Sequence, residues 1–184
     1  ALVQEAVVNG HLTVSLTPEM ADAFIIEVPT PFKDEALTIP DRPGDQVGDK
    51  HADMSYVVSA AHSIATVLQR GNLVVLESTS PPLTTYDIVA PILESNGLKA
   101  GQDFFLTYSP ERVLPGQILR ELVENARVIG GIDLASAEAG RDLYRIFVKG
   151  DIILTDSTTA EMVKLMENTY RDVNIAIANE FSRL

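Results

Sequence analysis

The sequence predicts an α/β fold in which a doubly wound parallel sheet is followed by a long helix. Three observations lead to this prediction. Short apolar runs alternate with segments of helical periodicity along the chain. Several runs, such as residues 73–76, are continuously apolar, as expected for strands that helices cover on both faces. Finally, residues 158–184 carry an unbroken apolar stripe at three-and-four spacing.

The strands and helices are assigned from local composition and spacing. The predicted strands are residues 12–16, 23–28, 73–77, 103–108, 127–129 and 152–155. The predicted helices are residues 1–9 before Gly10, a helix from the cap Asp53 to Gly71, one from Thr84 or Thr85 to Gly97 that Pro91 bends, and one from the cap Asp133 to Gly150. Residues 33–52 are rich in Pro, Gly and Asp, which predicts a surface loop.

The last helix has its own start signal. Thr158 is placed to cap it and Glu161 to reach back, the spacing of a capping box. Its apolar stripe consists of Val163, Met166, Tyr170, Val173, Ile177, Phe181 and Leu184. A helix of this length would extend for roughly 40 Å, too long to lie wholly on one small sheet. We therefore expect it to leave the domain and to contact something else.

Composition narrows the classes of function. With 184 residues, 46% of them hydrophobic, the chain can bury a sizeable core. Its 26 acidic and 14 basic residues give a net charge of −12, which argues against a nucleic-acid partner. It has no Cys, and its apolar runs are far shorter than the roughly 20 residues that span a bilayer. We expect a cytoplasmic protein with no membrane segment.

Both ends of the chain look interrupted. It begins without Met or a signal-peptide pattern and stops inside a helical pattern, so we expect an excerpt of a longer protein. We divide it into a partial nucleotide-binding domain, residues 1–156, and the start of a connecting helix, residues 157–184. No Gly-x-Gly-x-x-Gly motif occurs, and His11, His51 and His62 lack metal-ligand spacing, so no metal site is expected.

Three groups of residues could carry chemistry. The first comprises residues 28–31 and 77–82, which follow predicted strands, where ligands of parallel sheets bind. The second is residues 108–116, which place Glu111 beside Arg112. The third is Lys164, Asn168 and Arg171, one helical turn apart, which could hold an anionic substrate or a developing oxyanion. On spacing alone, a structural explanation without chemistry fits each group better. The first group would be residues typical of turns, the second a solvent-exposed charge pair, and the third the polar side of a helix.

Four of these segments, in this order, resemble the UDP-glucose/GDP-mannose dehydrogenase family. They are residues 21–31, 77–79, 109–116 and 159–174, and the resemblance extends from residue 2 to residue 184. The resemblance implies a Rossmann-like sheet that forms the C-terminal half of an NAD-binding domain, followed by the family's connecting and dimerisation helix. It also implies NAD as cofactor, a UDP-sugar as substrate, and oxidation of the sugar's C6 alcohol to a carboxylate in two hydride-transfer steps.

The resemblance also implies roles for individual residues. The implied catalytic residues are Thr79, which positions water near the nicotinamide, Glu111 for acid/base chemistry, Lys164 for oxyanion stabilisation and Asn168 for substrate orientation. Thr30, Ser78 and Thr79 would lie beside the cofactor. Arg112, Val113, Leu114, Lys164, Asn168 and Arg171 would bind the substrate. A homodimer through the last helix is implied as well.

The chain departs from the family pattern in three respects. We expect the glycine-rich turn and the ribose-binding acid to precede Ala1, and the catalytic Cys and UDP-binding domain to follow Leu184. Pro115 stands where the UDP-glucose branch has Glu, which favours the branch that oxidises UDP-N-acetyl-D-mannosamine for surface polysaccharides. Leu83 stands where Gly is common. The alternatives are UDP-glucose or UDP-N-acetylglucosamine as substrate, or a non-catalytic nucleotide-binding or interaction module.

Overall fold

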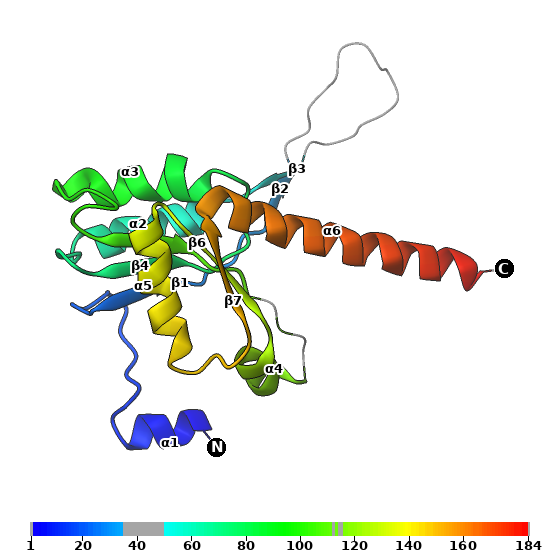
Figure 1. Cartoon of the computed structure of the whole chain (residues 1–184), viewed down its shortest axis with the longest axis horizontal. Helices are drawn as coiled ribbons and strands as arrows, with labels where there is room; N and C mark the ends of the chain where they lie inside the picture. The colour runs from blue at the N-terminus through cyan, green and yellow to red at the C-terminus, as the bar shows by residue number, and fades with distance from the viewer. Residues whose placement is uncertain (1, 35–49, 112, 114–115, 184) are drawn as a thin grey trace, which may run out of the picture.

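The computed structural model describes residues 2–34, 50–111, 113 and 116–183, and it has a central five-stranded sheet (Figure 1). The strand order is β1-β4-β5-β6-β7. The bounds are Ala23–Ile26 for β1, Leu73–Leu76 for β4, Phe105–Tyr108 for β5, Arg127–Gly131 for β6 and Ile152–Asp156 for β7. Neighbouring strands are parallel except β5 and β6, which are antiparallel, with Thr107 opposite Gly131. The α/β class and the mainly parallel sheet are confirmed.

The antiparallel β5–β6 pair corrects the expectation of a uniformly parallel sheet. A parallel connection would have to cross one face of the sheet, usually as a packed helix. Among its described residues the connection contains only one helix, α4, Ile118–Glu124, and none of the described α4 side chains is buried. Helix α4 therefore lies beside the sheet, and the chain re-enters β6 from the edge at which β5 ended (Figure 1).

Helices cover both faces of the sheet, as the continuous apolar runs predict. All four residues of β4 are buried, and they alternate between two clusters. Val74 and Leu76 pack with α2, Ser55–Ala65, with α3, Ala90–Leu93, and with the first turns of α6, Ser157–Phe181. On the other face, Leu73 and Val75 pack with α5, Leu134–Arg145. Strand β1 forms one edge of the sheet, and its Ile25 is half exposed.

The N-terminal third departs most from the sequence predictions. Helix α1, Leu2–Val8, is confirmed, and Gly10 with φ +72° follows it. Residues 12–16 form no strand, because their side chains are exposed and find no sheet to join. The predicted loop 33–52 is partly wrong, since Phe32–Asp34 and Lys50–Ala52 pair as antiparallel strands β2 and β3. Residues 35–49 of that loop lie outside the described residues.

The predicted helix starts hold better than the predicted ends. Asp133 caps α5 as predicted and accepts the Ser136 N–H at 2.7 Å. The predicted cap Asp53 is wrong by one residue: Met54 is the N-cap of α2 and makes no side-chain cap hydrogen bond, while Asp53, one position earlier, accepts the Ser55 N–H at 3.0 Å. However, α2 and α5 end several residues before Gly71 and Gly150. The segment from residue 84 to 97 begins as the π-helix η1, Thr84–Val89, continues as α3 and closes as the 3₁₀ turn η2, Glu94–Asn96, before Gly97 at φ +90°. Pro91, which has no N–H to donate, stands just where η1 gives way to α3.

The long helix is confirmed, but its predicted cap is wrong. Asp156 caps α6, because its carboxylate accepts the Thr159 N–H at 2.8 Å and the Thr159 hydroxyl at 2.6 Å. Glu161 does not reach back to the helix start; its side chain is buried instead. Figure 1 shows α6 running out of the domain. Among the described residues, no helix combines the length and the apolar character needed to cross a membrane.

The cap can be tested by substitution. Asp156→Ala should lower the free energy of unfolding by about 1 kcal/mol, the usual cost of losing a helix cap. Thr158→Ala is the matched control and should cost less. The two hydrogen bonds from Thr159 lower the pKa of Asp156 from its ordinary value of 3.8. The stabilisation is therefore full above about pH 4 and is lost as the pH falls through the lowered pKa. Denaturant unfolding at neutral and acidic pH measures both effects, and equal costs for the two variants would contradict the assignment.

Candidate active site

The carboxyl ends of β1, β4 and β5 lie at one edge of the sheet because these strands are parallel. The amino end of β6 joins them, since β6 runs the opposite way to β5. Three of the segments that the sequence singled out, around Thr30, Thr79 and Glu111, directly follow these strand ends. The edge at which open α/β sheets bind their ligands thus gathers the predicted residues.

A buried arginine connects two of these segments. The Arg127 guanidinium donates hydrogen bonds to Glu77 Oε1 and, at 2.8 Å, to the Ser109 hydroxyl, and its Nη2 lies 3.6 Å from Glu111 Oε2. The guanidinium carbon sits 3.9 Å from the centre of the Tyr144 ring, whose hydroxyl donates to Glu77 Oε1. A charged group this well buried needs such partners, and here they include the carboxylate predicted to act in catalysis.

Sequence reasoning missed Arg127 as a functional residue. The sequence predicts a strand that starts at residue 127, but a role for the charged Arg127 at the head of this apolar strand was not inferred. That position was the available signal, because Arg is rarely buried unless it is paired. Its partners Glu77 and Glu111 are 50 and 16 positions away along the sequence, so local spacing could not identify them.

Burial and neighbouring charges shift the titration of this network. Burial raises the pKa of Glu77, and the negative charge of Glu111 adds to the effect, while the Tyr144 hydrogen bond and the Arg127 charge oppose it. Burial and the charge of Glu77 raise the pKa of Tyr144, so its hydroxyl stays protonated and remains a donor. The network is therefore a fixed polar support below the candidate site.

The residues predicted to flank the cofactor differ in their surroundings. Thr30 and Thr79 are half-buried, each in the connection that follows its strand. Ser78 is buried, and its hydroxyl accepts the Val28 N–H at 2.8 Å and donates to the Val28 carbonyl at 2.9 Å. Ser78 thus ties the end of β4 to the segment after β1, and its hydroxyl is already engaged by that backbone.

Lys164 and Glu111 lie together, as a shared site requires. The Lys164 ammonium donates a hydrogen bond to the Glu111 backbone carbonyl. Both residues are half-buried, and the Glu111 carboxylate faces Arg127. Helix α6 therefore brings a cation directly to the loop that bears the acidic side chain, at the carboxyl edge of the sheet.

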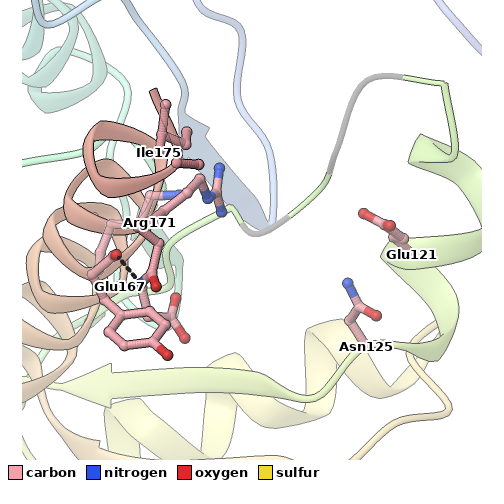
Figure 2. Close-up of a pocket in the computed structure, with 9 residues that line it drawn as sticks. Glu121, Asn125, Glu167, Arg171 and Ile175 are labelled. Atoms are coloured by element: carbon pink, nitrogen blue, oxygen red, sulfur yellow. Dashed lines mark hydrogen bonds between the residues drawn. The ribbon is translucent and has the colours of Figure 1, made fainter. Parts of the chain in front are cut away.

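A cavity of about 680 Å³ opens between α4 and α6. Figure 2 shows Glu121 and Asn125 on the α4 side facing Glu167, Arg171 and Ile175 of α6. The remaining lining residues are Lys164, Tyr170, Asn174 and Ala178. The cavity is large enough for an organic ligand and offers cationic, carboxylate and aromatic side chains.

The predicted substrate residues are only partly gathered at this cavity. Lys164 and Arg171 line it, whereas Asn168 is exposed on the flank of α6 and is not among its lining residues. Val113 is half-buried in the loop after Glu111. Arg112 and Leu114 lie outside the described residues. The roles of these residues stay predictions.

The strand ends fit one part of a dinucleotide. Thr30 and Thr79 present hydroxyl groups at adjacent strand ends, where a nicotinamide ring could lie. No glycine-rich turn that would hold a pyrophosphate is found in the sequence. These residues therefore suit the reactive end of the cofactor.

The fold and this site are those of a nucleotide-binding α/β domain. Residues 1–148 match the UDP-glucose/GDP-mannose dehydrogenase family, NAD binding domain, and residues 158–184 match the central domain of the same family. The chain belongs to the UDP-glucose/GDP-mannose dehydrogenase family. Its resemblance to that family and its NAD-binding, Rossmann-like domain are confirmed.

Individual relatives agree with this assignment. The chain is 50% identical over 183 residues to the UDP-N-acetyl-D-mannosamine dehydrogenase of Methanocaldococcus jannaschii, covering 100% of this chain and 39% of that protein. It is 47% identical over 190 residues to an NDP-N-acetyl-D-galactosaminuronic acid dehydrogenase of Ralstonia solanacearum, covering 100% of this chain and 42% of that protein. The chain thus spans about two fifths of the length of these relatives.

A solved structure shows the same relationship. The native structure of the UDP-N-acetyl-mannosamine dehydrogenase from Staphylococcus aureus superimposes on this chain with a TM-score of 0.84 at 49% sequence identity. The derivative structure of the same protein gives a TM-score of 0.83 at the same identity. The native superposition covers 98% of this chain and 41% of that one.

Proposed function

We propose that the protein containing this chain oxidises the C6 alcohol of UDP-N-acetyl-D-mannosamine to a carboxylate in two NAD-dependent steps. The observation that carries the proposal is the contact of Lys164 with the Glu111 loop at the carboxyl edge of the sheet. The 50% identity to a UDP-N-acetyl-D-mannosamine dehydrogenase along the whole chain supports the choice of substrate. A cytoplasmic setting and a role in supplying polysaccharide precursors belong to the same proposal.

The proposed roles follow from the charges that the reaction develops. Oxidation of the alcohol and addition of a nucleophile to the resulting aldehyde each develop negative charge on oxygen, and the second hydride then leaves the adduct so formed. A fixed ammonium such as that of Lys164 stabilises this charge most effectively where water is excluded. In this proposal Glu111 accepts or relays protons, and Thr79 holds a water molecule. NAD, when bound, supplies the electron acceptor of both steps.

Substrate binding is assigned to the cavity between α4 and α6. Arg171 and Lys164 provide positive charge in a protein whose net charge is −12, and a nucleotide diphosphate requires such local cations. Asn168 would orient the sugar from the flank of the same helix. The residues Arg112, Val113 and Leu114 complete the proposed set.

A galactose-configured substrate is the second candidate. The 47% identity to an NDP-N-acetyl-D-galactosaminuronic acid dehydrogenase is nearly as high as the identity to the mannosamine enzyme. Both names contain an N-acetylated sugar, so an N-acetyl preference is common to the two candidates. Their difference lies in the configuration of the ring.

An assay of the full-length protein tests the proposal. NADH formation is followed with UDP-N-acetylmannosamine, UDP-N-acetylgalactosamine, UDP-N-acetylglucosamine and UDP-glucose. Two NADH per sugar are expected with the mannosamine substrate, together with the uronate as product. Turnover of UDP-glucose alone would refute the assignment, and preference for the galactosamine substrate would select the second candidate.

The role of Lys164 gives a sharper prediction. Lys164→Ala in the full-length protein should lower kcat by about 10² to 10³, the usual cost of removing one oxyanion partner. Lys149→Ala, an exposed cation at the end of the α5 segment, is the control and should leave kcat unchanged. Steady-state kinetics measure both variants. A change in kcat of Lys164→Ala of only a few-fold would contradict the role.

We also infer that the outer part of α6 forms a homodimer interface. Tyr170, Val173, Ile177 and Phe181 continue the predicted apolar stripe, and between 50% and 75% of each is exposed. Burying them against a second copy would remove this apolar surface from water. Ile177→Glu with Phe181→Glu should therefore shift the full-length protein toward monomer in sedimentation velocity. Asn179→Glu, on the opposite side of α6, is the control and should not change the sedimentation. A wild-type protein that sediments as a monomer would refute the interface.

A further inference from the structure

Glu161 is a fully buried carboxylate that the proposed chemistry does not use. It lies on the second turn of α6, with 0% of its surface exposed. Its Oε2 accepts the Leu83 N–H at 2.6 Å, and its Oε1 accepts the Thr85 N–H at 2.8 Å and the Thr85 hydroxyl at 2.6 Å. One side chain of the long helix thus holds two backbone amides and a hydroxyl at the start of η1.

Those bonds fix one end of the connection that carries Thr79. This connection runs from the end of β4 at Leu76 to the start of η1 at Thr84. Its other end is held by Ser78, whose hydroxyl bonds to the backbone of Val28. Thr79 therefore lies between two anchors, one on the segment that follows β1 and one on α6, and its position depends on both.

The anchored backbone is strained at Leu83. This residue has φ +74°, in the left-handed region, where a non-glycine residue costs about 1 kcal/mol or more. A glycine at this position would adopt this conformation without that cost. In this chain the Leu83 N–H points to the Glu161 carboxylate, so the bond helps to hold the strained turn that follows Thr79.

The same side of α6 also holds the other catalytic segment. Lys164 follows Glu161 by three positions, one turn along the helix, and donates to the Glu111 carbonyl. Two consecutive turns of one rigid helix therefore hold the Thr79 connection and the Glu111 loop. The separation of these two segments is set by the helix that spans them.

We propose that Glu161 is a positioning residue, which fixes Thr79 relative to Lys164 and Glu111 by anchoring Leu83 and Thr85 to α6. This role deepens the proposed function and rests on it. Glu161 acts through the backbone and touches neither substrate nor cofactor. Deep burial suits such an anchor, because hydrogen bonds to a carboxylate strengthen where water is excluded.

The surroundings of Glu161 are consistent with an anchor. Burial raises its pKa, and its three hydrogen bonds act in the opposite direction. The neighbouring Tyr108 is fully buried, and burial together with the Glu161 charge raises the pKa of its hydroxyl. Asp156 contributes a further negative charge from the start of the helix.

The test compares Glu161→Ala and Glu161→Gln in the full-length protein. Glu161→Ala should lower kcat about 10- to 100-fold, because a displacement near 1 Å at a reacting group has that effect. The KM values for sugar nucleotide and NAD should change by less than about threefold. Glu161→Gln keeps one oxygen acceptor but turns an NH2 donor toward the other backbone N–H, so it should restore only part of kcat. Glu138→Gln, on the exposed side of α5, is the matched control and should leave kcat unchanged.

A second measurement separates positioning from mere stability. Hydrogen exchange of the Leu83 and Thr85 amides should accelerate at least about tenfold in Glu161→Ala, while β7 amides stay protected. Unchanged exchange or an unchanged kcat in Glu161→Ala would overturn the proposal. If Glu161→Ala does not fold, Thr85→Val removes only the hydroxyl bond and should lower kcat several-fold; an unchanged kcat would again overturn it. Hydrogen exchange can be measured without enzymatic turnover. A wild-type protein that oxidises none of the sugar nucleotides would therefore refute the proposed function, while the exchange of the Leu83 and Thr85 amides would still show whether Glu161 anchors them.

Discussion

The buried ion pair between Arg127 and Glu77 is the interaction on which the candidate site depends. It joins the end of β4 to the start of β6, and both charged groups are shielded from water. The guanidinium also engages Ser109 and faces Glu111, so one cation determines where two loops lie. Removing one partner of such a pair leaves an uncompensated buried charge, at a cost of about 3–5 kcal/mol. The pair therefore constrains geometry more than it adds net stability.

The reversal of β6 makes this arrangement possible. In a parallel β6, the first residue would lie at the amino edge of the sheet, about five residues or roughly 16 Å from the site. Because β6 is antiparallel to β5, Arg127 enters directly below Glu111. Helix α6 then approaches the same edge from one face of the sheet and contributes Glu161 and Lys164. The site is thus supported from the sheet by an arginine and from the helix by two consecutive turns.

Sequence reasoning succeeded where the signal is local. The run at residues 73–76, the cap Asp133 and the turn at Gly97 all follow from short-range composition, and the structure contains them. It failed where a distant partner decides. Asp156, and not Thr158, caps α6. Glu161, the expected partner in the capping box, instead accepts hydrogen bonds from Thr85 and Leu83, which lie 76 and 78 positions earlier in the sequence. The direction of β6 depends on whether α4 packs on a face of the sheet or beside it. The hydrophobic periodicity of the sequence does not predict that position. The resemblance identified the site residues, but the arginine that supports them required coordinates.

The exposed side of β1 has a practical consequence. This strand closes the described five-stranded sheet on one side, with Ile25 half exposed beside it. A strand at that position offers a row of peptide groups that can extend the ladder with another chain. When this chain is studied by itself, the edge strand β1 is therefore prone to pair with another chain, which leads to self-assembly. Engineering that covers the edge of β1 is the direct way to improve the solubility of the chain.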